Sequence, residues 1–233
     1  MTDRIWLDVP FRDKQTAKTA GARWDPTARR WWCTPGAPAA TRWPARPPLP
    51  YLLPGEDREY GTGLFVDLIP RGCWAINART MIDGADWDRV RRMVTDRADH
   101  TCETCHTPTP TGRTLDVHER WEYTLTVPGI LGVQRLRRLI ALCQDCHEAT
   151  HMGYAMTHGR LQEAGAHLAT VTGMTHDQAS RHIEAAFRTW QDRNQVRWTL
   201  DLDILTAAGI TLARQPDHGH IRPTARARDG FPI

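Results

Sequence analysis

The sequence predicts an α+β fold: a core of strands and a helix stabilised by zinc, a helical C-terminal extension, and a small α+β domain at the N-terminus. Three observations predict it. Two Cys-x2-Cys pairs can supply the four thiolates of one tetrahedral zinc. Between the pairs, an alternating run typical of a half-buried strand ends in a histidine and a glutamate. The second pair is followed by segments of helical periodicity.

The chain divides into five expected segments. Residues 1–34 carry strand, helix and hairpin patterns in that order, which predicts a small accessory domain. Residues 35–57 contain seven prolines, a composition that favours extended chain, so we expect an interdomain linker. Residues 58–158 form the zinc-stabilised core and residues 159–213 the helical extension, while residues 214–233 have the composition of a flexible tail.

Two signals mark elements of the extension. Thr175 and Gln178 have the spacing of a capping box, which predicts a helix that begins at this point. A last apolar segment runs from Trp198 to Leu205. Neither this segment nor any other approaches the roughly 20 apolar residues of a membrane span.

The composition indicates a cytoplasmic protein without a membrane partner. The first residues do not begin a signal peptide, and cysteines paired at metal spacing are typical of a reducing compartment. The net charge is only +3, but 28 of the 30 basic residues are arginines. Arginine is suited to binding phosphate, although a GC-rich genome gives the same bias without any function.

The four cysteines of the two pairs are candidate ligands of a structural Zn²⁺. They are Cys102, Cys105, Cys143 and Cys146. A disulfide pairing is disfavoured in a reducing compartment. Zinc alone does not indicate an activity, because many zinc ribbons bind the metal only to stay folded.

Three histidines are candidate ligands of a second, exchangeable divalent ion. His118 follows the alternating run, and His147 comes directly after the last cysteine. If the second cysteine pair opens a helix, His147 and His151 lie four residues apart on one face. Three neutral imidazoles favour transition metals over Mg²⁺, but Mg²⁺, Mn²⁺, Ni²⁺ and Zn²⁺ all remain candidates.

At these residues the chain resembles the HNH (ββα-metal) endonuclease family. The resemblance implies that His118 is the metal-binding member of a two-residue pair on a strand, and that His147 and His151 are the helix ligands. Glu119 stands where the family usually has a histidine that acts as general base. The resemblance therefore implies a catalytic trio of His118, Glu119 and His147, with Glu122 or His100 as alternative bases.

The wider similarity covers roughly residues 60–212 and is specific for the fold more than for activity. Its segments look like one group of bacterial and phage HNH proteins: Phe65–Pro70, His118–Trp121, Leu136–Cys143 and Trp198–Leu202. The N-terminal piece is similar to a small domain of unassigned function found on plasmid and phage proteins. The matching residues are Leu7–Phe11, Lys14, Ala17–Pro26 and Trp31.

Aromatic and basic residues suggest a nucleic-acid surface in residues 1–34. Trp24 and Trp31 could stack on bases, and Arg29 and Arg30 could bind phosphates, with Arg120 adding a contact beside the histidines. The alternative is that the tryptophans form the core of this small domain and the arginines are merely solvated. The sequence leaves both open.

The function that the resemblance implies is metal-dependent hydrolysis of DNA phosphodiester bonds, with defence against foreign or modified DNA as a plausible setting. The alternative is a zinc-stabilised nucleic-acid-binding protein without hydrolytic activity. We expect DNA as the partner, and RNA and a homodimer stay open.

Overall fold

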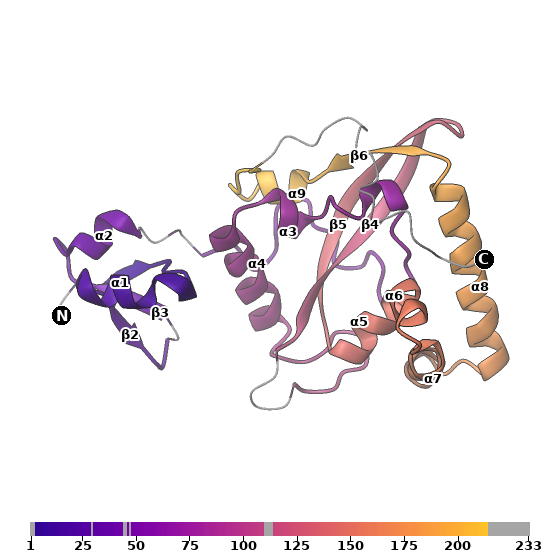
Figure 1. Ribbon diagram of the computed structural model, residues 1–233, viewed down its shortest axis with the longest axis horizontal. Coiled ribbons are helices and arrows are strands. Elements are labelled where there is room, and N and C mark those ends of the chain that lie inside the picture. Colours follow the sequence, from indigo (N-terminus) through magenta and orange to yellow (C-terminus); the bar gives the residue numbers. More distant parts are fainter. Residues whose placement is uncertain (1–2, 29, 44–45, 47, 110–113, 214–233) are drawn as a thin grey trace. The chain divides into compact units, whose positions relative to one another are not determined.

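The computed structural model describes residues 3–28, 30–43, 46, 48–109 and 114–213 (Figure 1). The chain forms two compact units, residues 1–49 and 50–233. Each unit contains both helices and strands, so the predicted α+β class is confirmed. Within the described residues, no helix is both long and apolar enough to cross a membrane. The expected tail, residues 214–233, lies outside the described residues.

The N-terminal unit is a three-stranded antiparallel sheet with helices on one face. Its elements are β1 (Ile5–Leu7), η1 (Phe11–Asp13), α1 (Lys14–Thr19), β2 (Arg23–Asp25), β3 (Arg30–Cys33) and α2 (Pro38–Arg42). The strand order is β1-β3-β2. The alternation of Ile5 and Leu7 puts both on the inner face, where Leu7 packs in the core with Ala17 of α1 and Ala39 of α2.

The proline-rich segment 35–57 differs from the expected extended linker at both ends. Pro38 occupies the first turn of α2, a position at which proline is pre-organised for a helix. Trp43, directly after α2, is buried in the N-terminal core, whereas Leu53 is fully buried in the second unit. The two ends of the segment are therefore packed into the two units.

A buried ion pair ties the end of that segment to the second unit. Two nitrogens of Arg97 lie 2.7 Å from the two carboxylate oxygens of Glu56. The two side chains are 1% and 0% exposed. Glu56 also accepts hydrogen bonds from the backbone N–H groups of Leu53 and Leu139. Its carboxylate therefore joins three segments that are distant in sequence.

This ion pair makes a truncation prediction. A chain of residues 50–233 should fold, whereas a chain of residues 58–233 should lose about 3–5 kcal/mol, because Arg97 would be buried without its carboxylate partner. Urea denaturation followed by circular dichroism measures both. The Glu56→Gln variant of the full chain should reproduce most of the loss. Equal stability of the two truncated chains would show that the ion pair is dispensable.

The second unit is built on a long β-hairpin. Its elements are η2 (Arg71–Cys73), α3 (Ala78–Met81), α4 (Gly84–Arg97), β4 (Asp116–Val127), β5 (Leu131–Leu142), α5 (Gln144–Thr150), α6 (Met152–Thr157), α7 (Leu161–Thr172), α8 (His176–Arg193), β6 (Arg197–Asp201) and α9 (Asp203–Thr206). The sheet order is β4-β5-β6. Strands β4 and β5 are antiparallel, and β6 runs parallel to β5.

The central strand β5 forms the middle of the core. Its last four residues, Leu139–Leu142, are all fully buried. Helices α4 and α5 both pack against β4 and β5, α7 packs on α5, and α8 packs on α7 (Figure 1). A continuous apolar run in a strand is typical of a strand covered on both faces, which explains why this segment does not alternate.

The expected helical extension contains a strand as well as helices. The capping box at Thr175 and Gln178 is present and opens α8, as predicted. Trp198 and Leu200, however, belong to β6, which completes the sheet beside β5. Gly132 of β5 makes room for this strand, since a Cβ there would lie 2.3 Å from the Trp198 ring. The extension is therefore part of the core of the second unit.

Candidate metal centre

The four paired cysteines form one cluster. Their sulfur atoms all lie within 4.8 Å of one another, and the Sγ atoms of Cys105 and Cys143 are 3.7 Å apart. A tetrahedron with Zn–S bonds of about 2.3 Å has edges of about 3.8 Å. None of the four is in a disulfide. The donor set and its spacing therefore fit a structural zinc ion.

Backbone hydrogen bonds bring the two cysteine pairs together. The loop after α4 closes on itself, with Cys102 N–H donating to Thr107 O at 3.1 Å. Glu103 then fastens this loop to the end of β5: its N–H donates to Ala141 O at 2.9 Å, and its carboxylate accepts from Ala141 N–H at 2.7 Å. Cys143 is two residues beyond Ala141, so these two hydrogen bonds hold the loop with Cys102 and Cys105 close to Cys143 and Cys146.

A histidine that the sequence did not single out contacts the cysteine cluster. Nε2 of His167, on α7, lies 3.1 Å from Sγ of Cys146. A thiolate accepts hydrogen bonds, so an Nε2–H donor here would offset part of the negative charge of four thiolates. A hydrogen bond from Cys146 also holds the pKa of the Cys102 thiol well below its usual value. No spacing rule points to His167, because it lies 21 residues beyond the last cysteine.

The three expected histidines also come together. His118 lies near the start of β4, His147 lies within α5, and His151 ends α5, with its N–H bonded to His147 O at 3.0 Å. The ring centroids are 4.7 to 5.4 Å apart, and the closest ring nitrogens all lie within 4.8 Å. Because the bond from His151 N–H to His147 O completes a helical turn, the His147 and His151 rings lie one turn apart on the same side of α5.

The state of these imidazoles suits a metal ion. Burial, above all, lowers the pKa of His118 well below its usual value and that of His151 to about 3. Both rings are therefore neutral near pH 7, which is the form that binds metals. His118 is 2% exposed, and among the described residues its Nε2 has no hydrogen-bond partner. A buried nitrogen beside two other imidazoles is the kind of atom that a divalent ion would satisfy.

Asp116 orients one of the histidines, and the sequence reading missed it. Its carboxylate lies 3.2 Å from Nδ1 of His147, which leaves Nε2 as the free ligand nitrogen. His147 in turn lowers the pKa of this carboxyl group. The sequence contains a pattern that could have indicated this role: Asp116 precedes His118 by two residues in an alternating strand, so both side chains lie on one face.

We expect Asp116→Asn to weaken binding of a divalent ion at the histidines by about 10- to 100-fold, because the carboxylate no longer fixes the His147 ring. The fold should change little, since Asp116 is half exposed. Isothermal titration with Mn²⁺ or Ni²⁺ measures the affinity. Asp145→Asn, which removes the same charge from the exposed side of α5, should leave it unchanged. An equal loss in both variants would mean that only net charge matters.

Glu119 lies next to His118 and is anchored by backbone. Its carboxylate accepts a hydrogen bond of 2.9 Å from the N–H of Ala78, at the start of α3. Burial raises the pKa of Glu119 to about 7, and the bond from Ala78 counteracts part of this rise. The alternative bases lie elsewhere: Glu122 pairs with Arg137 at 3.1 Å, and His100 is an exposed residue of the turn after α4.

Arg120 cannot be a nucleic-acid contact, contrary to the prediction. Its side chain is 0% exposed, and the guanidinium group lies over the Phe65 ring at 4.1 Å and donates to Gly63 O. Burial lowers its pKa to about 10, so it stays charged at neutral pH. The reason is strand alternation, which places Arg120 on the same inward face as His118.

The residues of the N-terminal unit that were expected to contact nucleic acid do not lie on one face of its sheet. Trp24 is 48% exposed and meets Trp31 edge to face at 5.5 Å, while Trp31 packs against the core. Arg30 lies over the Trp6 ring at 5.7 Å. Arg29 lies outside the described residues.

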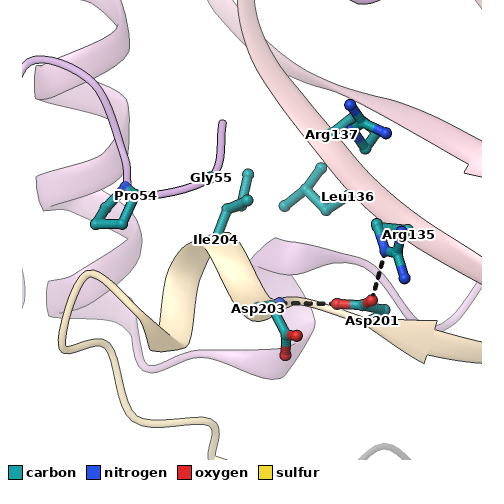
Figure 2. A pocket seen from close by; sticks show the side chains of 8 residues that line it. All are labelled: Pro54, Gly55, Arg135, Leu136, Arg137, Asp201, Asp203 and Ile204. Atoms are coloured by element: carbon teal, nitrogen blue, oxygen red, sulfur yellow. Dashed lines mark hydrogen bonds and ion pairs between the residues drawn. The ribbon is translucent and has the colours of Figure 1, made fainter. Parts of the chain in front are cut away.

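A concave site further along the hairpin has no comparable chemistry. Figure 2 shows the residues that line it: Pro54, Gly55, Arg135, Leu136, Arg137, Asp201, Asp203 and Ile204. Both of its arginines already have carboxylate partners, since Arg135 pairs with Asp201 at 2.7 Å and Arg137 with Asp57, outside the lining, at 2.9 Å. None of its residues belongs to either metal-ligand cluster.

Comparisons with known proteins concern the N-terminal unit. Residues 4–44 match a family described as a domain of unknown function (DUF5710). A stretch of 35 residues is 46% identical to DNA primase TraC of Escherichia coli, covering 15% of this chain and 3% of that protein. No HNH family model and no solved structure matches the chain. The expected similarity of the N-terminal piece to a domain of unassigned function is thereby confirmed.

Proposed function

We propose that this chain is a metal-dependent endonuclease of the HNH type that hydrolyses phosphodiester bonds in DNA. The observation that carries the proposal is the convergence of His118, His147 and His151 at one point, beside a four-cysteine cluster that shares α5 with them. Zinc held by the cysteines would fix the start of α5 against the end of β5. The same helix would then present two of the three ligands of the second ion.

The residues divide the chemistry between them. The three histidines would hold a divalent ion, which supplies a Lewis acid for the scissile phosphate when bound. Asp116 keeps the His147 ring in the ligating tautomer through their 3.2 Å contact. Glu119 is the proposed acceptor of the proton from the attacking water, since His147 lies close enough to lower the pKa of its carboxyl group and the Ala78 N–H limits the positions of that carboxylate.

The carboxylate at position 119 also provides the test of that role. We expect Glu119→Gln to slow cleavage by roughly 10²- to 10⁴-fold with unchanged metal binding, since the amide cannot take up the proton. The variant keeps the shape of the side chain and can still accept from Ala78 N–H. Single-turnover cleavage at saturating Mn²⁺ measures the rate. Cleavage at the parent rate would assign the base to another residue.

A second candidate function is nucleic-acid binding without hydrolysis. One observation favours it: the proposed base is a carboxylate held by a backbone N–H, where the family usually has a histidine. The short similarity to a DNA primase fits either function, because a nuclease and a non-catalytic binding protein must both bind DNA. It supports DNA as the partner through the N-terminal unit.

Incubation of the purified protein with supercoiled plasmid separates the two candidates. The nuclease should convert it to nicked and linear forms with Mg²⁺, Mn²⁺ or Ni²⁺, and conversion should stop with EDTA. The binding protein should shift the plasmid on a gel in both conditions without breaking it. A parallel His118→Ala preparation controls for contaminating nucleases, because the contaminant would cut in both preparations.

A further inference from the structure

The outer face of the N-terminal sheet carries residues that the core does not use. Strand pairing sets Trp6 opposite Trp32, and Trp32 opposite Arg23. Residues two apart in a strand share a face, so Arg30 joins Trp32; Arg4 precedes β1, but its guanidinium group lies over the Trp32 ring and so on the same face. Trp6 and Trp32 are partly exposed and lie outside the core cluster, which holds Leu7 and Cys33 of the opposite face.

Arginine and tryptophan side chains on this face stack on one another. The guanidinium carbons of Arg4 and Arg23 lie 4.5 and 5.5 Å from the Trp32 ring centroid. Arg30 lies 5.7 Å from that of Trp6. All three distances are within the range of a cation–π interaction, roughly 6 Å. We name these five residues, Arg4, Trp6, Arg23, Arg30 and Trp32, the Trp–Arg face.

The charge of the Trp–Arg face is unbalanced. Asp25 pairs with Arg4 at 2.7 Å and so neutralises one of the three guanidinium groups. Neither Arg23 nor Arg30 forms an ion pair with another residue that the structure describes. The guanidinium groups of Arg23 and Arg30 are therefore available to an anionic partner, beside the indole rings of Trp6 and Trp32.

We propose that the Trp–Arg face binds single-stranded nucleic acid. Phosphates would pair with the free guanidinium edges, and unstacked bases would lie against Trp6 and Trp32, the combination that single-strand binding requires. The bases of a duplex are stacked on one another, so a duplex could contact only the arginines, through its phosphates, and not the tryptophan rings. This goes beyond the proposed endonuclease, whose histidines belong to the second unit, and it moves the expected contact from Trp24 and Trp31 to the other side of the sheet.

Fluorescence anisotropy of a labelled 15-nucleotide oligothymidylate with the full-length chain, without added divalent ions, tests this proposal. Trp32→Ala should weaken binding about 5- to 50-fold, the range expected for loss of one stacked base. Arg23→Gln should weaken it several-fold and reduce the slope of log K against log salt by about 0.7, the loss of one phosphate contact. Trp32→Phe, which keeps a stacking ring, should restore most of the binding.

Two matched variants serve as controls. Arg12→Gln removes an exposed charge from η1, and Trp24→Ala removes the half-exposed indole that meets Trp31; both should bind within about twofold of the parent. Equal losses for Arg12→Gln and Arg23→Gln, or for Trp24→Ala and Trp32→Ala, would overturn the proposal. So would competition by duplex DNA or heparin as strong as that by the single strand. Plasmid cleavage tests a separate claim, since it depends on the histidines.

Discussion

Cys146→Ala is expected to unfold the second unit. Zinc binding by four thiolates contributes to folding free energy directly, and apparent values in small zinc domains are about 10–16 kcal/mol. Cys146, in the first turn of α5, is fully buried, and it contacts both Cys102 and His167 of α7. Loss of this one sulfur would release α5, and with it His147 and His151.

Elemental analysis and thermal unfolding measure this effect. The parent should retain about one zinc per chain, and Cys146→Ala should retain far less and lose its cooperative transition. Cys73→Ala is the matched control, because Cys73 is also a buried free cysteine but lies outside the cluster. It should keep the zinc. A Cys146→Ala protein that is folded and zinc-replete would disprove a structural role for the cluster.

His147→Ala is expected to reduce DNA cleavage by roughly a thousandfold, on the order of 4 kcal/mol of transition-state stabilisation. The fold should survive, since His147 is only half buried and its partner Asp116 is itself exposed. This variant separates stability from activity, because the cysteine cluster and the histidine group share α5 but would bind different ions.

His158→Ala provides the comparison for His147→Ala. His158 is an exposed histidine at the end of α6 that stacks on Tyr154 at 3.9 Å and belongs to neither cluster. Its removal should leave cleavage within about twofold. If both histidine variants lose activity alike, the effect is not specific to the proposed ion. If neither does, the three-histidine group is not catalytic.

Both metal-ligand clusters could be predicted from the sequence because their spacing follows from local geometry. Cys-x2-Cys places two sulfurs on one turn, and His147 and His151 are one helical turn apart. The third histidine, His118, was marked by its place at the end of the alternating run, although it lies 29 residues before His147 in sequence.

What could not be predicted depends on tertiary contacts. His167 reaches the cysteines because α7 packs on α5, and the inward-facing Arg120 is covered by the segment around Phe65, whose ring lies under its guanidinium group. Likewise, β6 forms because Gly132 leaves space for Trp198, a fit that no local propensity records. Prolines at residues 35–57 suggested an extended linker, but Pro38 starts a helix.

The most direct measurement is cleavage rate against occupancy of the second ion, on zinc-replete protein titrated with Mn²⁺. Equilibrium dialysis gives the bound Mn²⁺ per chain, and the plasmid assay gives the rate in the same samples. We predict that both rise together to saturation at about one added ion per chain, and that His147→Ala loses both. Two results would contradict the assignment of the three histidines to catalysis. One is an intact plasmid although Mn²⁺ fills the histidine site, and the other is a cleavage rate that does not depend on the bound Mn²⁺.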